Sequence, residues 1–159
     1  MTIQPNTGIP AVARGEVAAA LTKVLADTYA VYLKTHGYHW NVRGMHFGEL
    51  HALFMDQYTE MWGALDEVAE RIRALGEFAP QGYSALANLT GIKDGDPEKD
   101  APAMLRELLQ DHETVIGTLR HAVETAEQNS DVVTADLATQ RLATHEKHAW
   151  MLRATLGSK

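Results

Sequence analysis

The sequence predicts an all-α protein, a bundle of four long helices with a short extra helix in the connector between the second and third. Apolar residues recur at helical spacing over four runs of roughly 25 to 30 residues. Residues that favour helices, such as Ala, Leu, Glu, Arg and Met, fill these runs, while four of the five prolines and most of the twelve glycines lie outside them. The length of 159 residues, 45% of them hydrophobic, indicates one domain.

The first long helix is predicted over residues 16–41. Residues 1–15 are expected to form a flexible N-terminal arm, because prolines and glycines interrupt them. The bundle domain is then expected to span residues 16–157. Gly44 marks the turn after the first helix. The apolar positions of this helix are Val17, Leu21, Val24, Leu25, Val31 and Tyr32.

The second helix is predicted over residues 46–75 and is the longest, with Gly76 as its C-terminal cap. Residues 77–95 form a long connector to the third helix. Within it a short helix is expected at residues 84–89, with Ser84 as its N-cap. The apolar face of the second helix consists of Phe47, Leu50, Phe54, Tyr58, Met61, Leu65, Val68 and Ile72.

Two more long helices follow the connector. Asp100 and Pro102 form a favourable helix start, so the third helix is predicted from Asp100 to about Gln128. The fourth begins after Ser130 and ends at Gly157. The connector between the second and third helices can serve as the long crossover found in some four-helix bundles.

Composition excludes several classes of function. The chain has no cysteine, which rules out disulfides and thiolate metal centres. No signal-like segment and no run of about 20 apolar residues is present, so a cytoplasmic location and no membrane partner are expected. The net charge of −7 argues against broad nucleic-acid binding and favours attraction of cations.

Four residues of the first two helices are candidate metal ligands. His39 and His51 lie six residues on either side of Met45, so a helical hairpin would place them at similar height. Asp66 and Glu70 are four residues apart and share one helix face. Histidine and carboxylate ligands on rigid helices suit Fe(II), although these residue types do not exclude Zn, Mn or Cu.

The spacing of these residues predicts a site shared between two chains. Asp66 lies 15 residues after His51, or about 22 Å along a straight helix, so one metal cannot bind both within one chain. A second copy with an antiparallel second helix would supply the carboxylates, with a two-fold axis near Thr59. A site inside the bundle would need two Glu-x-x-His pairs, which the sequence lacks.

One set of residues matches a known family pattern in both type and spacing: His39-Trp40-Asn41-Val42, Gly44, Phe47, Leu50-His51, Phe54, Asp66 and Ala69-Glu70-Arg71. By this pattern the chain resembles the Dps family, the DNA-binding proteins from starved cells, which are miniferritins of the ferritin-like superfamily. In length and helix order the resemblance covers residues 16–157. The predicted fold is therefore a ferritin-like four-helix bundle.

The resemblance implies a homododecameric shell, built from two-fold dimers, that acts as a ferroxidase and iron store. Fe(II) is oxidised by hydrogen peroxide, or alternatively oxygen, and Fe(III) is stored inside, which protects against oxidative damage. By position His39, His51, Asp66 and Glu70 match the iron ligands, with two irons expected per inter-subunit site. Trp40 would donate an electron to an oxidised intermediate. Simple packing of its ring is an equally open alternative.

One departure from the family pattern keeps a second function open. The family usually has an acidic residue one turn after the second histidine, and this chain has Met55 there. A thioether is a poor ligand for a hard ferric ion, so the second iron is expected to bind weakly. The alternative is a non-enzymatic, metal-binding or nucleoid-associated shell that protects DNA. Direct DNA binding is not favoured, because the N-terminal arm has only Arg14 where DNA-binding relatives have lysine-rich tails.

Other acidic residues and histidines are considered for roles outside the iron site. The carboxylates of Asp136, Asp131 and Glu127 are candidates for lining pores that admit Fe(II), with helix capping as the alternative for Asp131. The four remaining candidate histidines are expected to be solvated rather than ligands: His36, His121, His145 and His148.

Overall fold

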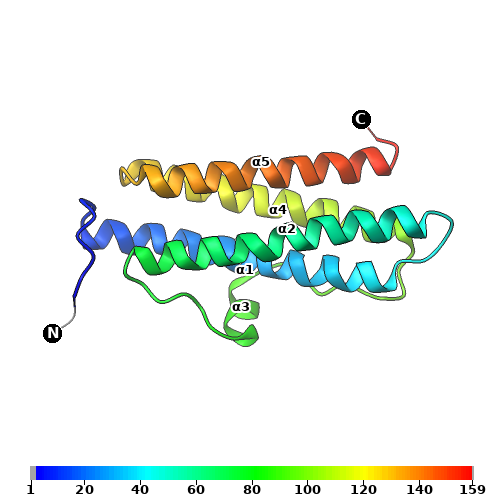
Figure 1. The fold of residues 1–159 in the computed structure, drawn as a ribbon, viewed down its shortest axis with the longest axis horizontal. Coiled ribbons are helices and arrows are strands. Elements are labelled where there is room, and N and C mark those ends of the chain that lie inside the picture. Colours follow the sequence, from blue (N-terminus) through cyan, green and yellow to red (C-terminus); the bar gives the residue numbers. More distant parts are fainter. Residues whose placement is uncertain (1–2, 159) are drawn as a thin grey trace.

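A computed structural model describes residues 3–158, and in that range it contains five helices and no strand (Figure 1). The helices are α1 (Ala11–Asn41), α2 (Phe47–Ala74), α3 (Tyr83–Leu89), α4 (Ala101–Gln128) and α5 (Val132–Thr155). α1 and α2 form one antiparallel pair and α4 and α5 another, and α1 also packs on α4. The short α3 lies against α1 on the outside of the bundle. The predicted all-α four-helix bundle is confirmed.

α1 begins at Ala11, five residues before the predicted start at Glu16. Pro10 is its N-cap residue, with a φ of −57° and a ψ of 150°. Arg14 is buried, and its Nε donates a hydrogen bond of 3.0 Å to the backbone carbonyl of Leu75 at the end of α2. This bond satisfies a carbonyl that has no partner within α2. Residues 11–15 therefore belong to the bundle and not to the predicted arm.

The helix starts follow local capping, with one correction. Asp100 caps α4 as predicted, accepting a hydrogen bond of 2.8 Å from the backbone nitrogen of Ala103. The N-cap of α3 is Gly82 rather than the predicted Ser84. Gly82 has a φ of 88°, a left-handed conformation that glycine adopts without strain. The turn between α1 and α2 likewise uses Gly44, whose φ is 116°.

The core is divided into two apolar clusters. One surrounds Leu21, Met61 and Leu119, and the other surrounds Phe54 and Leu108. Between them, buried polar residues from all four long helices form a band that we call the polar layer: Lys34, Gln57, Asp111, His112, Arg141, His145 and His148.

The polar layer holds together through ion pairs and a histidine contact. Lys34 of α1 lies 2.7 Å from a carboxylate oxygen of Asp111, and Arg141 of α5 forms a bidentate ion pair with Glu60 of α2. The Nδ1 atoms of His112 and His145 are 2.9 Å apart. Several side-chain atoms of the layer, including both amide atoms of Gln57, have no hydrogen-bond partner among the described residues.

The expectation that His145 and His148 are solvated was wrong. His145 is fully buried and His148 is 7% exposed. With Arg141 they follow a spacing of four and then three residues, which places all three on the inner face of α5. Burial lowers the pKa of His148 to about 4 and that of His112 to about 3. These imidazoles are therefore neutral at pH 7.

Candidate metal centre

His39 and His51 meet at the hairpin between α1 and α2. His39 lies in the last turn of α1 and His51 in the first turns of α2, and their rings stack with centroids 3.7 Å apart at an angle of 18°. The expectation of similar height is met. His39 is buried and His51 is half-buried.

Each imidazole is oriented by the backbone of the other helix. His39 Nδ1 donates to the carbonyl oxygen of His51 over 2.7 Å, and His51 Nδ1 donates to the carbonyl oxygen of His39 over 2.8 Å. A carbonyl oxygen only accepts, so both Nδ1 atoms carry the proton. Both Nε2 atoms then have a free lone pair, the state in which an imidazole binds a metal. The carbonyl of His39 is available because it belongs to the last turn of α1.

Asp66 and Glu70 lie on the exposed face of α2. Among residues 3–158 neither carboxylate has an ion pair or a side-chain hydrogen bond. The neighbouring arginines, which were possible partners, bond elsewhere: Arg71 pairs with Asp131 at 2.8 Å, and Arg73 donates to the carbonyl oxygen of Glu77. The two carboxylates are therefore open to solvent and to external cations.

The structure does not bring the carboxylates to the histidines within one chain. α2 runs as one continuous helix, so Asp66 stays about 22 Å from His51 along it. In the part of the chain that the structure describes, no three His, Cys, Asp or Glu side chains are arranged to hold a metal ion. Each half of the predicted site is thus incomplete in a single chain.

Met55 lies one turn after His51 on the same face of α2, and its side chain is 44% exposed. Its neighbour Asp56 is exposed as well, but it lies about 100° further round the helix. This end of the site therefore offers a thioether where a second iron would need an oxygen ligand.

An aromatic cluster, formed by Tyr29, Tyr32, His36, Trp40, Tyr58 and Trp62, adjoins the histidine pair. Tyr58 meets His39 edge to face at 5.2 Å, and His36 stacks on Tyr58 at 3.9 Å. The Tyr32 hydroxyl is 3.1 Å from His36 Nδ1. Trp40 contacts His36 at 4.4 Å and is 65% exposed.

The aromatic cluster corrects the expectation that His36 is solvated. His36 is half-buried between Tyr32 and Tyr58, and burial together with His39 lowers its pKa. Sequence reasoning missed the cluster. The sequence does contain a pattern that predicts the cluster. Aromatic rings recur every four residues at positions 32, 36 and 40 of α1 and at 58 and 62 of α2, which puts each set on one helix face.

The candidate pore residues separate into two groups. Asp136 is exposed and lines a shallow groove of about 400 Å³ between α2 and α5, together with Glu67 and Glu70. Glu127 is exposed near the end of α4. Asp131, by contrast, is 1% exposed, so the expectation that it lines a pore was wrong.

Asp131 is a structural cap. Its carboxylate accepts a hydrogen bond from the backbone nitrogen of Thr134 at the start of α5 and pairs with Arg71 of α2. Although burial opposes it, hydrogen bonds from Thr134 and Arg71 lower the pKa of Asp131. The capping alternative is therefore the correct one.

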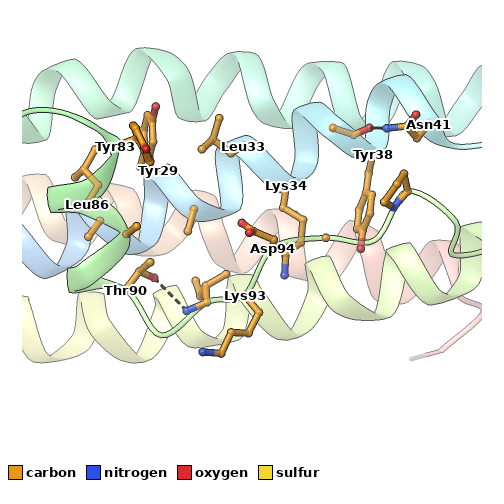
Figure 2. A pocket seen from close by; sticks show the side chains of 17 residues that line it. Tyr29, Leu33, Lys34, Tyr38, Asn41, Tyr83, Leu86, Thr90, Lys93 and Asp94 are labelled. Carbon is orange, nitrogen blue, oxygen red and sulfur yellow. Dashed lines mark hydrogen bonds between the residues drawn. The ribbon is translucent and has the colours of Figure 1, made fainter.

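A larger cleft of about 610 Å³ lies between α1, α3 and the connector after α3. Figure 2 shows Tyr29, Leu33 and Tyr38 of α1 on one wall and Leu86 of α3 on another. None of the candidate metal ligands lines it. Lys34 opens into this cleft, but its charge is compensated by Asp111.

No helix within residues 3–158 has both the length and the apolar content that crossing a membrane requires.

Most of the chain is similar to known proteins. A family model described as a ferritin-like domain matches residues 18–158. DNA protection during starvation protein 2 of Bacillus anthracis is 34% identical over 141 residues, which cover 89% of this chain and 97% of the relative. The DNA protection during starvation protein of Brevibacillus brevis is 34% identical over 140 residues, covering 88% and 94%.

Solved structures agree with these sequence matches. The Dps protein of Vibrio cholerae O1, described as a member of a broad superfamily of ferritin-like diiron-carboxylate proteins, superposes with a TM-score of 0.92 at 30% identity. The match covers 98% of this chain and 99% of that one. The Dps protein of Mycobacterium smegmatis gives a TM-score of 0.93 at 29% identity, covering 100% and 98%.

Proposed function

The chain belongs to the Dps miniferritins of the ferritin-like family, and on that premise we propose that it is a ferroxidase and iron store. In this proposal it oxidises Fe(II), preferably with hydrogen peroxide, and holds the Fe(III) product inside a hollow homododecamer in the cytoplasm. This activity would protect the cell from the radicals that free Fe(II) and peroxide generate.

The reciprocal bonding of His39 and His51 is the observation that carries the proposal. Two imidazoles fixed in one tautomer, each with Nε2 free, offer two oriented nitrogen ligands for iron. Backbone carbonyls hold them in place, so little side-chain entropy is lost when iron binds.

The remaining ligands are proposed to come from a second copy. Asp66 and Glu70 are exposed and have no bond to other described side chains, as a surface that completes a partner's site requires. The α2 surface around Thr59 also carries exposed apolar side chains, with Trp62 60% exposed and Met55 44% exposed, which suits burial against another chain. A two-fold axis there gives two equivalent sites per dimer, each with room for two irons.

The chemistry follows from these ligands. Bound Fe(II) is the substrate, and two such ions supply the two electrons that reduce one hydrogen peroxide molecule to water. Carboxylates from the partner stabilise the higher charge of the ferric product. Glu67, Glu70 and Asp136 share one groove on each chain, and their combined negative charge would concentrate Fe(II) beside the site.

A mixing experiment tests the shared site. His51→Ala and Asp66→Ala are each expected to abolish fast peroxide-dependent oxidation, because each removes a ligand from every site. When the two variants exchange subunits, some sites regain both wild-type halves, and fast oxidation measured by stopped-flow absorbance should return in that fraction. Failure to recover activity, with exchange verified by mass spectrometry, would rule out the shared geometry.

A non-enzymatic shell is the second candidate, and Met55 is the observation that favours it. Such a shell would bind Fe(II) or protect DNA with little oxidation. The two candidates differ in one measurement, since an enzyme consumes peroxide in proportion to the iron that it oxidises.

A further inference from the structure

The aromatic cluster contains a hydrogen-bonded tyrosine–histidine pair that the proposed iron chemistry does not use. Tyr32 and His36 are four residues apart on α1, and the Tyr32 hydroxyl lies 3.1 Å from His36 Nδ1. Both side chains are half-buried. The distance is within the range over which a proton moves directly between the two groups.

A continuous series of ring contacts links this pair to the candidate iron site. His39 contacts the edge of Tyr58 at 5.2 Å, Tyr58 stacks on His36 at 3.9 Å and 13°, and His36 bonds to Tyr32. A direct ring contact of 6.2 Å also joins His36 to His39. Trp40 contacts His36, and most of its surface is exposed.

With Met55 in place of an acidic ligand, the proposed site would lack one of the two electrons that reduce peroxide. Two irons deliver both electrons that peroxide requires, but a site with Met55 is expected to hold its second iron weakly. A site with one iron delivers one electron and would leave a hydroxyl radical. An electron donor in the protein would prevent its release.

We propose that the Tyr32–His36 pair supplies this second electron, with Tyr58 as the bridge to His39. The inference rests on the ferroxidase function proposed above. Fe(II) and Tyr32 each give up one electron to hydrogen peroxide, the O–O bond breaks, and both oxygens leave as hydroxide. The phenolic proton of Tyr32 moves to His36 Nδ1. Fe(III), a neutral Tyr32 radical and a protonated His36 remain, so charge and atoms balance.

The protonation states in the cluster suit this role. For His36 to accept the proton, Nδ1 must carry a lone pair before the reaction. A hydrogen bond of 3.1 Å from the Tyr32 hydroxyl to His36 Nδ1 uses this lone pair. Burial, with Tyr29 and Tyr58 nearby, raises the pKa of Tyr32, so its hydroxyl keeps its proton until oxidation removes an electron.

Freeze-quench electron paramagnetic resonance tests the proposal. Wild-type shells loaded anaerobically with one Fe(II) per site and mixed with hydrogen peroxide should show a neutral tyrosyl radical. Tyr32→Phe should reduce that signal by roughly tenfold or more, because the donor hydroxyl is gone. A spin trap in the same samples should report more hydroxyl radical from the variant than from wild type.

Two further variants locate the radical and its base. Tyr29→Phe is the matched control, since Tyr29 is on the same helix, 6.0 Å from the Tyr32 ring, and has no hydroxyl bond to a histidine in the described chain. It should leave the signal unchanged. His36→Gln retains a hydrogen-bond acceptor but no base, and it should slow the appearance of the radical.

The outcomes separate the inference from the function on which it rests. Equal radical yields in wild type and Tyr32→Phe, or a signal lost only in Trp40→Phe, would overturn the role of Tyr32. In either case iron oxidation, followed by its ferric absorbance, would still proceed. Absence of any peroxide-dependent iron oxidation in wild type would instead refute the ferroxidase function itself.

Discussion

At the scale of single residues, His39 and His51 orient each other. The Nδ1 atom of each ring donates to a backbone carbonyl of the opposite helix, so the two imidazoles and the α1–α2 hairpin form one rigid unit. Met55, one turn after His51, is exposed and occupies the position where the family pattern has an acidic residue. The ligand strength at this end of the site therefore depends on one side chain.

Substitution of Met55 measures that dependence. Met55→Glu should raise the rate of peroxide-driven Fe(II) oxidation and bring anaerobic Fe(II) binding closer to two ions per site, because a carboxylate is a hard ligand. Met55→Leu is the control for shape without a ligand and should resemble wild type. Equal rates for the glutamate and leucine variants would show that position 55 does not contact the second iron.

At the scale of helices, the junction between α2 and α5 depends on Asp131. Its carboxylate caps α5 and also pairs with Arg71 of α2, whose Nε donates to the Thr134 hydroxyl over 2.8 Å. One buried acid thus fixes both where α5 starts and how α5 sits on α2. Asp100 caps α4 in the same way, but it is exposed and forms no ion pair within the described range.

The two caps make a matched comparison. Asp131→Ala should lower the free energy of unfolding by roughly 2–4 kcal/mol, because it removes a cap and leaves the Arg71 charge without its partner at a mostly buried position. Asp100→Ala should cost only about 1 kcal/mol, the ordinary value of a cap. Chemical denaturation of both variants checks this, and similar losses would mean that the ion pair adds nothing.

At the scale of the whole molecule, the polar layer crosses the bundle and contains residues from every long helix. Lys34, Asp111, Glu60 and Arg141 form two ion pairs around three buried imidazoles. A protonated imidazole there would add a positive charge in a region where Arg141 is already present. The layer should therefore make bundle stability sensitive to acid.

The direction of this pH dependence follows from the pKa values. Burial lowers the pKa of His148 to about 4, that of His112 to about 3, and that of His145 well below its usual value of 6.5. Between about pH 6.5 and 4 the unfolded chain binds protons that the folded chain does not, so stability should fall as pH falls through this window. Burial raises the pKa of Asp111, which acts in the opposite direction.

Thermal unfolding at several pH values measures the effect. The Tm of wild type should drop as the pH is lowered from 7 to about 4. His148→Gln should show a shallower drop, because one proton-binding group is gone. His121→Gln, at an exposed histidine of α4, is the control and should follow wild type. Parallel curves for all three proteins would show that the buried imidazoles do not govern acid stability.

The sequence by itself determined the long helices, and it proposed the members of the candidate site. Periodicity and capping residues predicted all four long helices, and Asp100 was correctly identified as a cap, because these signals are local in the chain. Spacing also predicted that His39 and His51 meet and that Asp66 cannot join them in one chain. The binding of iron by these residues stays a prediction.

Tertiary structure alone decided which polar side chains are buried. His145, His148 and Asp131 are polar residue types that usually lie on the surface, and the sequence around them does not identify their distant partners. Their environment depends on contacts such as Arg71 with Asp131, 60 residues apart, and His112 with His145, 33 residues apart. A polar group is stable in a core only where distant residues supply its hydrogen bonds, and helix packing decides where that occurs.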